Sequence, residues 1–231
     1  MTHAPAGFEE RAGDGTTELA VYVGEDGVAG IREAFPQATV EPVADDWEDR
    51  WREFHRPVEA GGLWIGPLWI ESPPDRPTVV VDPGRAFGTG AHATTRACIE
   101  LLSRLERGSI LDAGCGSGVV SVAAARLGFA PVRAVDHDQV AVDVAIESAR
   151  LNDVAVEVAR ADILADALPV SDVAVANIDL PIVERLLDRV DARHAVTSGY
   201  LASELPSRPG WEPVDRVELE GWAADVLAKR H

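Results

Sequence analysis

The chain has 231 residues, 46% of them hydrophobic, which suffices for one catalytic domain with a buried core and a small appendage. Its formal net charge of −18 creates a field that repels phosphate backbones and attracts cations, so we expect no direct nucleic-acid partner. The chain has only two cysteines, which excludes a disulfide framework, and the spacing of its histidines predicts no metal site. It has no long apolar run and no signal-like start. We therefore expect a cytoplasmic protein with no membrane partner.

The N-terminal residues predict a small α+β module over residues 1–46. Apolar alternation and turn residues favour a strand at 18–23, a helix at 28–35 and a strand at 38–43. This fragment resembles part of a ferredoxin-like module. A fragment of this size is too small to fold alone.

A linker is expected over residues 47–76. Its first part carries an apolar stripe at helical spacing, which comprises Trp47, Trp51, Phe54 and Val58. Its second part is punctuated by glycine and proline around two apolar pieces, 63–65 and 68–70, which predict short strands. The boundary to the main domain, 77–231, falls near Pro77.

The main domain alternates strands and helices. Strands are expected at 110–112, 132–136, 155–160, 173–177 and 194–198, and helices at 118–127, 140–152 and 181–190. This order predicts a doubly wound α/β fold with a mainly parallel sheet. The last segments, 211–219 and 222–229, predict an antiparallel hairpin that closes the sheet.

A glycine loop joins the first strand and helix of this domain. Gly114, Gly116 and Gly118 allow the backbone to approach a ligand at a helix N-terminus. The next strand ends in Asp136, whose carboxylate can accept the two hydroxyls of a ribose. The loop and this acid together predict a nucleoside site.

The loop favours S-adenosylmethionine over a dinucleotide. A pyrophosphate fingerprint requires a third glycine where this chain has Val119 or Ser121. In addition, Asp112 opens the loop with a carboxylate that repels phosphate and suits the cationic amino-acid end of S-adenosylmethionine. The pattern therefore predicts a class I, Rossmann-like, S-adenosylmethionine-dependent methyltransferase.

Two further segments are expected at the same edge of the sheet. Asn177 ends the fourth strand, where it would lie beside the reactive methyl group; the alternative is that it caps the helix beginning near Pro181. Residues 82–95 contain three glycines around one aromatic, which predicts a loop able to fold over a ligand or an ordinary surface loop. Within it, His92 could take the released proton, or it could be structural.

With these residues in view, the chain resembles the ribosomal protein L11 methyltransferases of the PrmA type. Residues 82–95 are similar to that family's signature loop, and 112–118, Asp136 and 175–178 follow at the expected distances. The resemblance extends from about Gly7 to the C-terminus. It places cofactor contacts, by motif, on Thr95, Gly114, Asp136 and Asn177, with Phe87 and Gly88 in the covering loop.

The resemblance implies transfer of methyl groups to lysine or N-terminal amines of a basic ribosomal protein. It also shows departures: Asp179 makes the acceptor side more acidic, and prolines allow only a short helix within 201–210. The resemblance also implies that residues 1–46 are part of the family's substrate-recognition module, whose first strand and helix are missing before Gly7. We expect that the true start lies upstream; the alternatives are that a partner or second copy covers the open strand edge, or that the module has decayed and recognition has weakened.

Other functions remain open at this point. The acceptor could be another protein lysine or a small amine, or the chain could be a non-catalytic cofactor-binding regulator. A nucleobase methyltransferase usually has an aromatic platform where this chain has Leu180, so base stacking is not supported.

Overall fold

The computed structural model describes residues 9–12, 17–20, 25–39, 56–82 and 90–230. By its internal contacts the chain divides into two compact units, Met1–Arg50 and Trp51–His231, each described by itself below.

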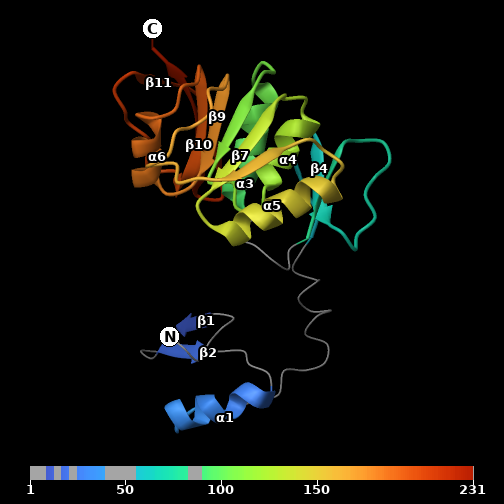
Figure 1. Ribbon diagram of the computed structural model, residues 1–231, viewed down its shortest axis with the longest axis vertical. Helices are drawn as coiled ribbons and strands as arrows, with labels where there is room; N and C mark the ends of the chain where they lie inside the picture. Colours follow the sequence, from blue (N-terminus) through green and yellow to red (C-terminus); the bar gives the residue numbers. More distant parts are fainter. Residues whose placement is uncertain (1–8, 13–16, 21–24, 40–55, 83–89, 231) are drawn as a thin grey trace. The chain divides into compact units, whose positions relative to one another are not determined.

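The described residues of the first unit form a short antiparallel sheet and a helix (Figure 1). β1 (Glu9–Ala12) pairs with β2 (Thr17–Ala20), and α1 (Glu25–Ala34) follows. The strand expected at 18–23 is present at residues 18–20, with its remaining residues outside the described part of the chain, and the helix expected at 28–35 is present as α1. The strand expected at 38–43 does not form at residues 38 and 39, and its remaining residues lie outside the described part of the chain.

A seven-stranded sheet forms the centre of the second unit, in the order β11-β12-β10-β9-β6-β7-β8. The five strands from β10 to β8 are parallel, and β12 and β11 add an antiparallel hairpin at one edge. The strands are β6 (Ile110–Ala113), β7 (Val132–Asp136), β8 (Glu157–Arg160), β9 (Val173–Asn177), β10 (His194–Leu201), β11 (Trp211–Leu219) and β12 (Trp222–Lys229). The predicted α/β fold with its C-terminal hairpin is confirmed.

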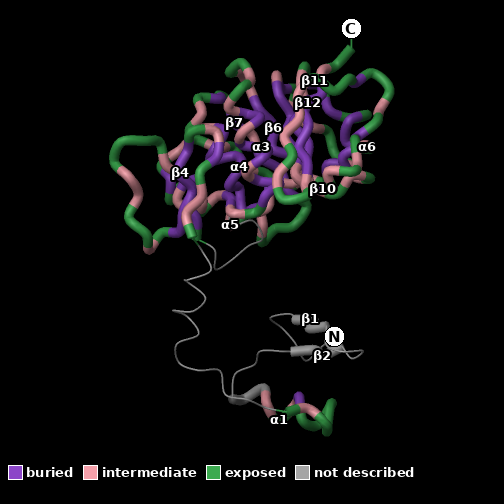
Figure 2. The backbone as a smooth tube through the Cα atoms, turned by 180° about the vertical axis from the view of Figure 1, so that it is seen from behind, coloured by how far each residue is buried: buried purple, intermediate pink, exposed green. Residues whose placement is uncertain are grey.

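Helices cover both faces of this sheet because its central strands are apolar on both sides. Ile110, Val173 and Val175 belong to the core on one face, whereas Leu111 and Ala174 belong to the core on the other. The helices are α3 (Ala93–Arg104), α4 (Val119–Arg126), α5 (Gln139–Leu151) and α6 (Leu180–Leu187). α3 and α4 pack in the first core and α6 packs in the second. Buried residues therefore follow the sheet through the middle of the unit (Figure 2).

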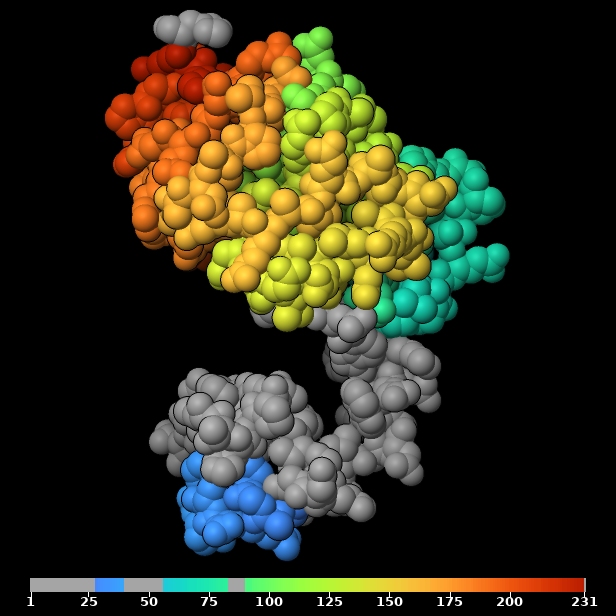
Figure 3. All heavy atoms as spheres, in the orientation of Figure 1, coloured from blue at the N-terminus to red at the C-terminus, as the bar shows by residue number. Residues whose placement is uncertain are grey.

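A smaller three-stranded sheet extends the first core. β3 (Val58–Ala60) is antiparallel to β4 (Leu63–Pro67), and β4 is parallel to β5 (Thr78–Val81). Leu63 and Val79 are buried in the same core as α3 and α4. On the face shown in Figure 3, the residues of this small sheet lie at one end of the second unit and the C-terminal residues at the other.

One asparagine fastens this small sheet to the rest of the unit. Asn152, which follows α5 and is 2% exposed, accepts a hydrogen bond from the Val80 N–H (2.7 Å) and donates one to the Val80 carbonyl (2.8 Å). Its amide also donates to the Ser148 carbonyl at 2.9 Å. A single buried side chain thus satisfies both backbone groups of Val80.

Several expected elements differ from the structure. Residues 68–70 form a turn instead of a strand, because the chain reverses after Pro67 and the Ile70 N–H bonds to the Pro67 carbonyl (3.1 Å). No helix forms within 201–210, where two prolines interrupt the backbone donors. Val58, expected at the end of a helix, begins β3.

Besides β3, two further elements of the second unit were missed. α3 and β5 had no predicted counterpart. The other members of the expected helical stripe, Trp47, Trp51 and Phe54, lie outside the described residues. The division into functional domains at 1–46, 47–76 and 77–231 stays a prediction.

Among the described residues, no helix combines the length and apolarity needed to cross a membrane.

We predict that Asn152→Ala lowers the free energy of unfolding by about 2 to 4 kcal/mol, because it leaves both backbone groups of Val80 without their partner. Urea denaturation measures this change. Leu151→Ala, at a neighbouring exposed position, is the control and should cost less than about 1 kcal/mol. If Asn152→Ala loses no more stability than the control, the hydrogen bonds between Asn152 and Val80 contribute little to the free energy of unfolding.

Candidate cofactor and acceptor site

The glycine loop leaves β6 and crosses the end of β7. Gly114 has a φ of 81°, and the N–H groups of Gly114 and Cys115 both donate to the Val135 carbonyl, at 2.8 and 3.0 Å. The loop ends at Gly118, with a φ of 76°, which precedes α4. A Cβ atom at Gly118 would lie 2.9 Å from that of Ala145, so glycine is needed for close packing of α4 on α5.

Asp136 is held at the end of β7 by this loop. One carboxylate oxygen accepts the Gly116 N–H at 2.9 Å, and the other accepts the Asp138 N–H at 3.0 Å. An ionised carboxylate offers about four acceptor positions, so each oxygen keeps capacity for a ligand hydroxyl. Asp136 is 8% exposed and lies on the wall of a cavity.

The cavity has a volume of about 300 Å³ and lies beyond the carboxyl ends of the parallel strands. It combines carboxylates with apolar side chains. Its lining consists of Gly114, Asp136, His137, Ala161, Asp162, Ile163, Leu164, Ile178 and Ile182. Such a mixture suits a flat, partly apolar ligand that carries hydroxyl groups.

Of the nine lining residues, only Gly114 and Asp136 were predicted as site residues, and seven were missed. Asp162 and Ile163 follow β8, and Ile178 follows β9. Their positions directly after strand ends were the available signal, since ligands of open α/β sheets lie at that edge.

Asn177 ends β9 and is fixed by a threonine of α3. Its amide Nδ2 donates to the Thr95 hydroxyl at 3.2 Å, and Thr95 itself is buried. The alternative that Asn177 caps the following helix is wrong, because the N-cap of α6 is Asp179, whose Oδ1 accepts the Ile182 N–H at 3.0 Å. Asp179 is thus engaged in a cap at an exposed position.

His92 has structural contacts. It is the N-cap of α3, its Nδ1 lies 2.8 Å from the Thr94 hydroxyl, and its ring meets the Trp222 ring edge-on at 5.1 Å. The proposed proton acceptance by His92 stays a prediction. Phe87 and Gly88, expected in a covering loop, lie outside the described residues.

Asp112 lies beneath the glycine loop and is 3% exposed. Its carboxylate accepts the Ser121 hydroxyl at 2.5 Å. Burial, together with the smaller effect of the nearby Asp136 charge, raises the pKa of this carboxyl to about 6, and the hydrogen bonds from Ser121 oppose this rise only in part. A cation near the loop would favour the ionised form.

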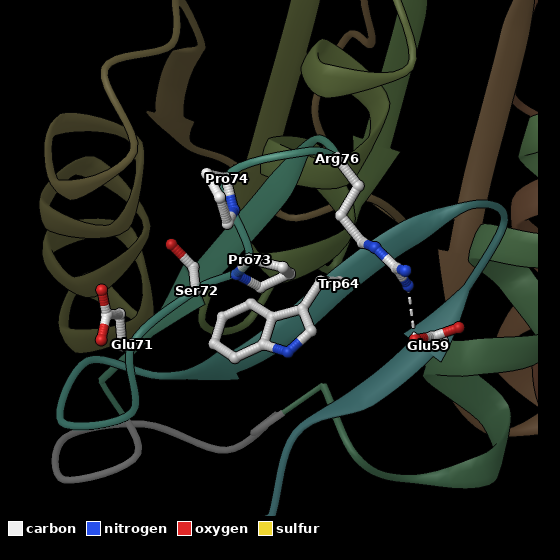
Figure 4. Close-up of a pocket in the computed structure, with 7 residues that line it drawn as sticks. All are labelled: Glu59, Trp64, Glu71, Ser72, Pro73, Pro74 and Arg76. Carbon is white, nitrogen blue, oxygen red and sulfur yellow. Dashed lines mark hydrogen bonds and ion pairs between the residues drawn. The ribbon is translucent and has the colours of Figure 1, made fainter.

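A larger hollow lies elsewhere, on the three-stranded sheet (Figure 4). It measures about 410 Å³ and is lined by Trp64, two prolines and the Arg76–Glu59 ion pair, whose N and O atoms are 2.6 Å apart. None of the predicted cofactor residues lines it. The smaller cavity, where the strand ends converge, is therefore the candidate site. Within the described ranges, no three His, Cys, Asp or Glu side chains are grouped to hold a metal ion.

The sheet order, the glycine loop and the acid after β7 define the fold of class I S-adenosylmethionine-dependent methyltransferases. Residues 17–206 match the family model of ribosomal protein L11 methyltransferase (PrmA). The chain belongs to this family.

Individual relatives agree with this assignment. The chain is 37% identical to the ribosomal protein L11 methyltransferase of Methylococcus capsulatus, over 94% of this chain and 78% of the relative. It is 35% identical to that of Caldanaerobacter subterraneus subsp. tengcongensis, over 80% of this chain and 65% of the relative. For Dictyoglomus thermophilum the identity is 35%, over 70% of this chain and 56% of the relative, so the chain spans less than two thirds of the length of some relatives.

A solved structure shares the fold. The crystal structure of ribosomal protein L11 methylase from Lactobacillus delbrueckii subsp. bulgaricus superposes with a TM-score of 0.65 and 25% identity. The match covers 77% of this chain and all of that one.

We predict that Asp112→Asn stabilises the ligand-free chain near neutral pH. The folded pKa of about 6 exceeds the ordinary value of 3.8, so the contribution of Asp112 to stability is present below pH 3.8 and is lost as the pH rises through 6. Asparagine keeps an oxygen for the Ser121 hydroxyl but cannot ionise. The free energy of unfolding should therefore exceed that of the wild type by about 2 to 3 kcal/mol at pH 7.5, with the difference vanishing near pH 4.

Urea denaturation at the two pH values checks this prediction. Asp153→Asn, which removes the same charge at an exposed position, is the control. A difference in Asp112→Asn that is the same at both pH values would contradict burial as the cause.

Proposed function

We propose that the chain is an S-adenosylmethionine-dependent protein methyltransferase that acts in the cytoplasm on lysine or N-terminal amines, with ribosomal protein L11 as its substrate. The observation that carries this proposal is the Asn177 amide, held by Thr95 at the edge where the cavity opens between the glycine loop and Asp136. Family membership supports the same reaction.

The cavity fits the proposed cofactor. Asp136 keeps acceptor capacity for both ribose hydroxyls, and Ile163, Leu164 and Ile178 supply apolar surface for a purine ring. Asp162 adds an acceptor for an exocyclic amine at the same cavity. When bound, S-adenosylmethionine supplies an electrophilic methyl group, and its cationic amino-acid end would suit Gly114, Gly116 and the buried Asp112 carboxylate.

Asn177 has the chemistry to position an amine acceptor. With Nδ2 donating to Thr95, its carbonyl Oδ1 is left to accept an N–H from the incoming amine. A lysine must first lose its proton, which costs roughly 4 to 5 kcal/mol at pH 7. Holding the neutral amine in line at about 3 to 3.5 Å from the methyl is then the main task of the site.

The charge of the chain favours a cationic substrate. With 39 acidic and 21 basic residues, its field attracts a basic ribosomal protein and disfavours a free nucleic acid. Leu180, at the start of α6, offers no aromatic platform for a flipped base. The other acceptors consistent with the site are a different protein lysine or a small amine.

We keep residues 1–46 as the proposed recognition module and 77–231 as the catalytic domain. Every described residue assigned above to cofactor or acceptor belongs to the second unit, which supports this division.

The deciding experiment is incubation with a ribosomal-protein extract and labelled S-adenosylmethionine, followed by mass spectrometry of the labelled species. We expect label on amines of ribosomal protein L11. Label on RNA or on small molecules alone would exclude the proposed substrate. If the chain binds the cofactor but labels nothing, the result would favour the alternative that it is a non-catalytic regulator.

We predict that Asp136→Ala weakens cofactor binding by roughly 1.5 to 3 kcal/mol, since two charge-assisted hydrogen bonds to the ribose are lost. Calorimetric titration measures the dissociation constant. Asp138→Ala, which removes an exposed N-cap two residues away, should bind the cofactor normally. An unchanged constant in Asp136→Ala would remove the ribose assignment.

Asn177→Ala should lower kcat by about tenfold or more while changing the cofactor dissociation constant by less than about threefold, because its carbonyl acts on the attacking amine. Asp179→Ala is the matched control, because it removes the true helix cap and should cost about 1 kcal/mol of stability with normal turnover per folded molecule. Equal turnover in the two variants would exclude the proposed role of Asn177.

A further inference from the structure

A β-bulge interrupts β10 beside the acceptor residue. Ser198 is paired with Asn177 on β9, and the pairing of β10 with β12 shifts between Ser198 and Tyr200. The extra residue is Gly199, whose φ of 100° is one that side-chain-bearing residues rarely adopt.

The backbone after Asn177 occupies the place of the missing side chain. A Cβ atom at Gly199 would lie 2.1 Å from the Ile178 carbonyl oxygen and 2.6 Å from its carbonyl carbon. These are backbone atoms, which cannot rotate aside. The Ile178 N–H also donates to the Ser198 carbonyl at 3.0 Å, so the Ile178 peptide is seated directly in the bulge.

Ile178 connects this bulge to the cofactor cavity. Its side chain lines the cavity, and its Cγ2 would lie 3.1 Å from a Cβ atom at Gly114. A displacement of the Ile178 peptide would therefore move both Asn177 and the wall that faces the glycine loop.

A buried polar network holds the far side of the bulge. The Tyr200 hydroxyl lies 2.8 Å from Asp225 Oδ2 and 2.8 Å from the Thr197 hydroxyl. Asp225 is fully buried and pairs with Arg216 at 2.9 Å. A buried ion pair is costly to desolvate and stabilises little by itself. The Asp225–Arg216 pair nevertheless has a structural role, because Asp225 binds the hydroxyl of Tyr200, the residue that follows Gly199.

Arg216 extends the network to the chain that leaves β10. One of its guanidinium nitrogens donates to the carbonyls of Ala202 and Glu204, at 2.7 and 3.0 Å. The backbone on the C-terminal side of Gly199 is thus held at several points, while Ser198, fully buried, donates to the Ala223 carbonyl at 2.6 Å on the other side.

We propose that Gly199 is a positioning residue: its bulge, fixed by Tyr200, Asp225 and Arg216, seats the Ile178 peptide and so aligns Asn177 with the cofactor cavity. This inference rests on the proposed methyl transfer.

The test compares Gly199→Ala with Gly128→Ala. Gly128 has a similar φ of 94°, but a Cβ atom there would meet no atom within 4 Å. Both variants carry the strain of alanine in the left-handed region, and only Gly199→Ala displaces Ile178. With labelled S-adenosylmethionine and the ribosomal-protein extract, we expect kcat per folded molecule to fall at least tenfold in Gly199→Ala and to stay within twofold in Gly128→Ala.

A double-mutant cycle separates positioning from general damage. In an Asn177→Ala background, Gly199→Ala should lower kcat by less than twofold further, because the residue that it positions is already gone. Tyr200→Phe, which keeps the ring and removes the hydroxyl, serves if Gly199→Ala does not fold, and it should lower kcat severalfold with the same lack of additivity.

Each result decides between defined outcomes. An active wild type with equal kcat in Gly199→Ala and Gly128→Ala, or full additivity with Asn177→Ala, overturns the positioning role and leaves the proposed function standing. A wild type that binds no S-adenosylmethionine and labels no amine overturns the proposed function, and this inference with it.

Discussion

The register of the parallel strands β6, β7 and β9 is the constraint on which the rest of the structure depends. Asp112 of β6 is paired with Ala134 on one side and Val175 on the other. Because these strands end at one edge, the glycine loop, Asp136 and Asn177 converge there from distant parts of the chain. A slip of one residue would turn the apolar side chains of a strand to the wrong face, so core packing enforces the geometry of the site.

Two buried acids near this edge are compensated in different ways. Asp225 has a guanidinium and a phenol beside it, yet burial still raises its pKa. Asp112 has only Ser121 as a partner among the contacts described above, and burial raises its pKa as well. A bound cation would offset the second cost and not the first. Stability and ligand binding are therefore linked through Asp112, whereas the Asp225 network is a fixed part of the fold.

Sequence patterns predicted the parts of the fold that depend on local periodicity. The ends of β7, β9, β11 and β12 agree with prediction to the residue, because apolar runs bounded by turn residues define them. α3 was not predicted because its N-cap is His92, an uncommon capping residue. β5 was not predicted because it directly follows Pro77, the expected boundary of the main domain.

The site was predictable where a motif marks it and unpredictable where long-range pairing creates it. The glycine loop and Asp136 carry their own pattern. The bulge at Gly199 had a signal, a lone glycine within an apolar strand, but its meaning depends on which backbone lies opposite. The contact between Asn177 and Thr95, like the partners of Asp225, requires the pairing of strands and helices that no local spacing reveals.

The hydrogen bonds between Asn152 and Val80 affect association with other chains. Among the described strands, β5 pairs with β4 alone, so its other edge carries backbone groups of the kind that recruit foreign strands. Asn152 occupies the N–H and carbonyl of Val80 at the middle of that edge, and Arg126 donates to the Thr78 carbonyl at 3.0 Å. The edge is thus closed by side chains of the same molecule, and β5 offers little template for edge-to-edge aggregation.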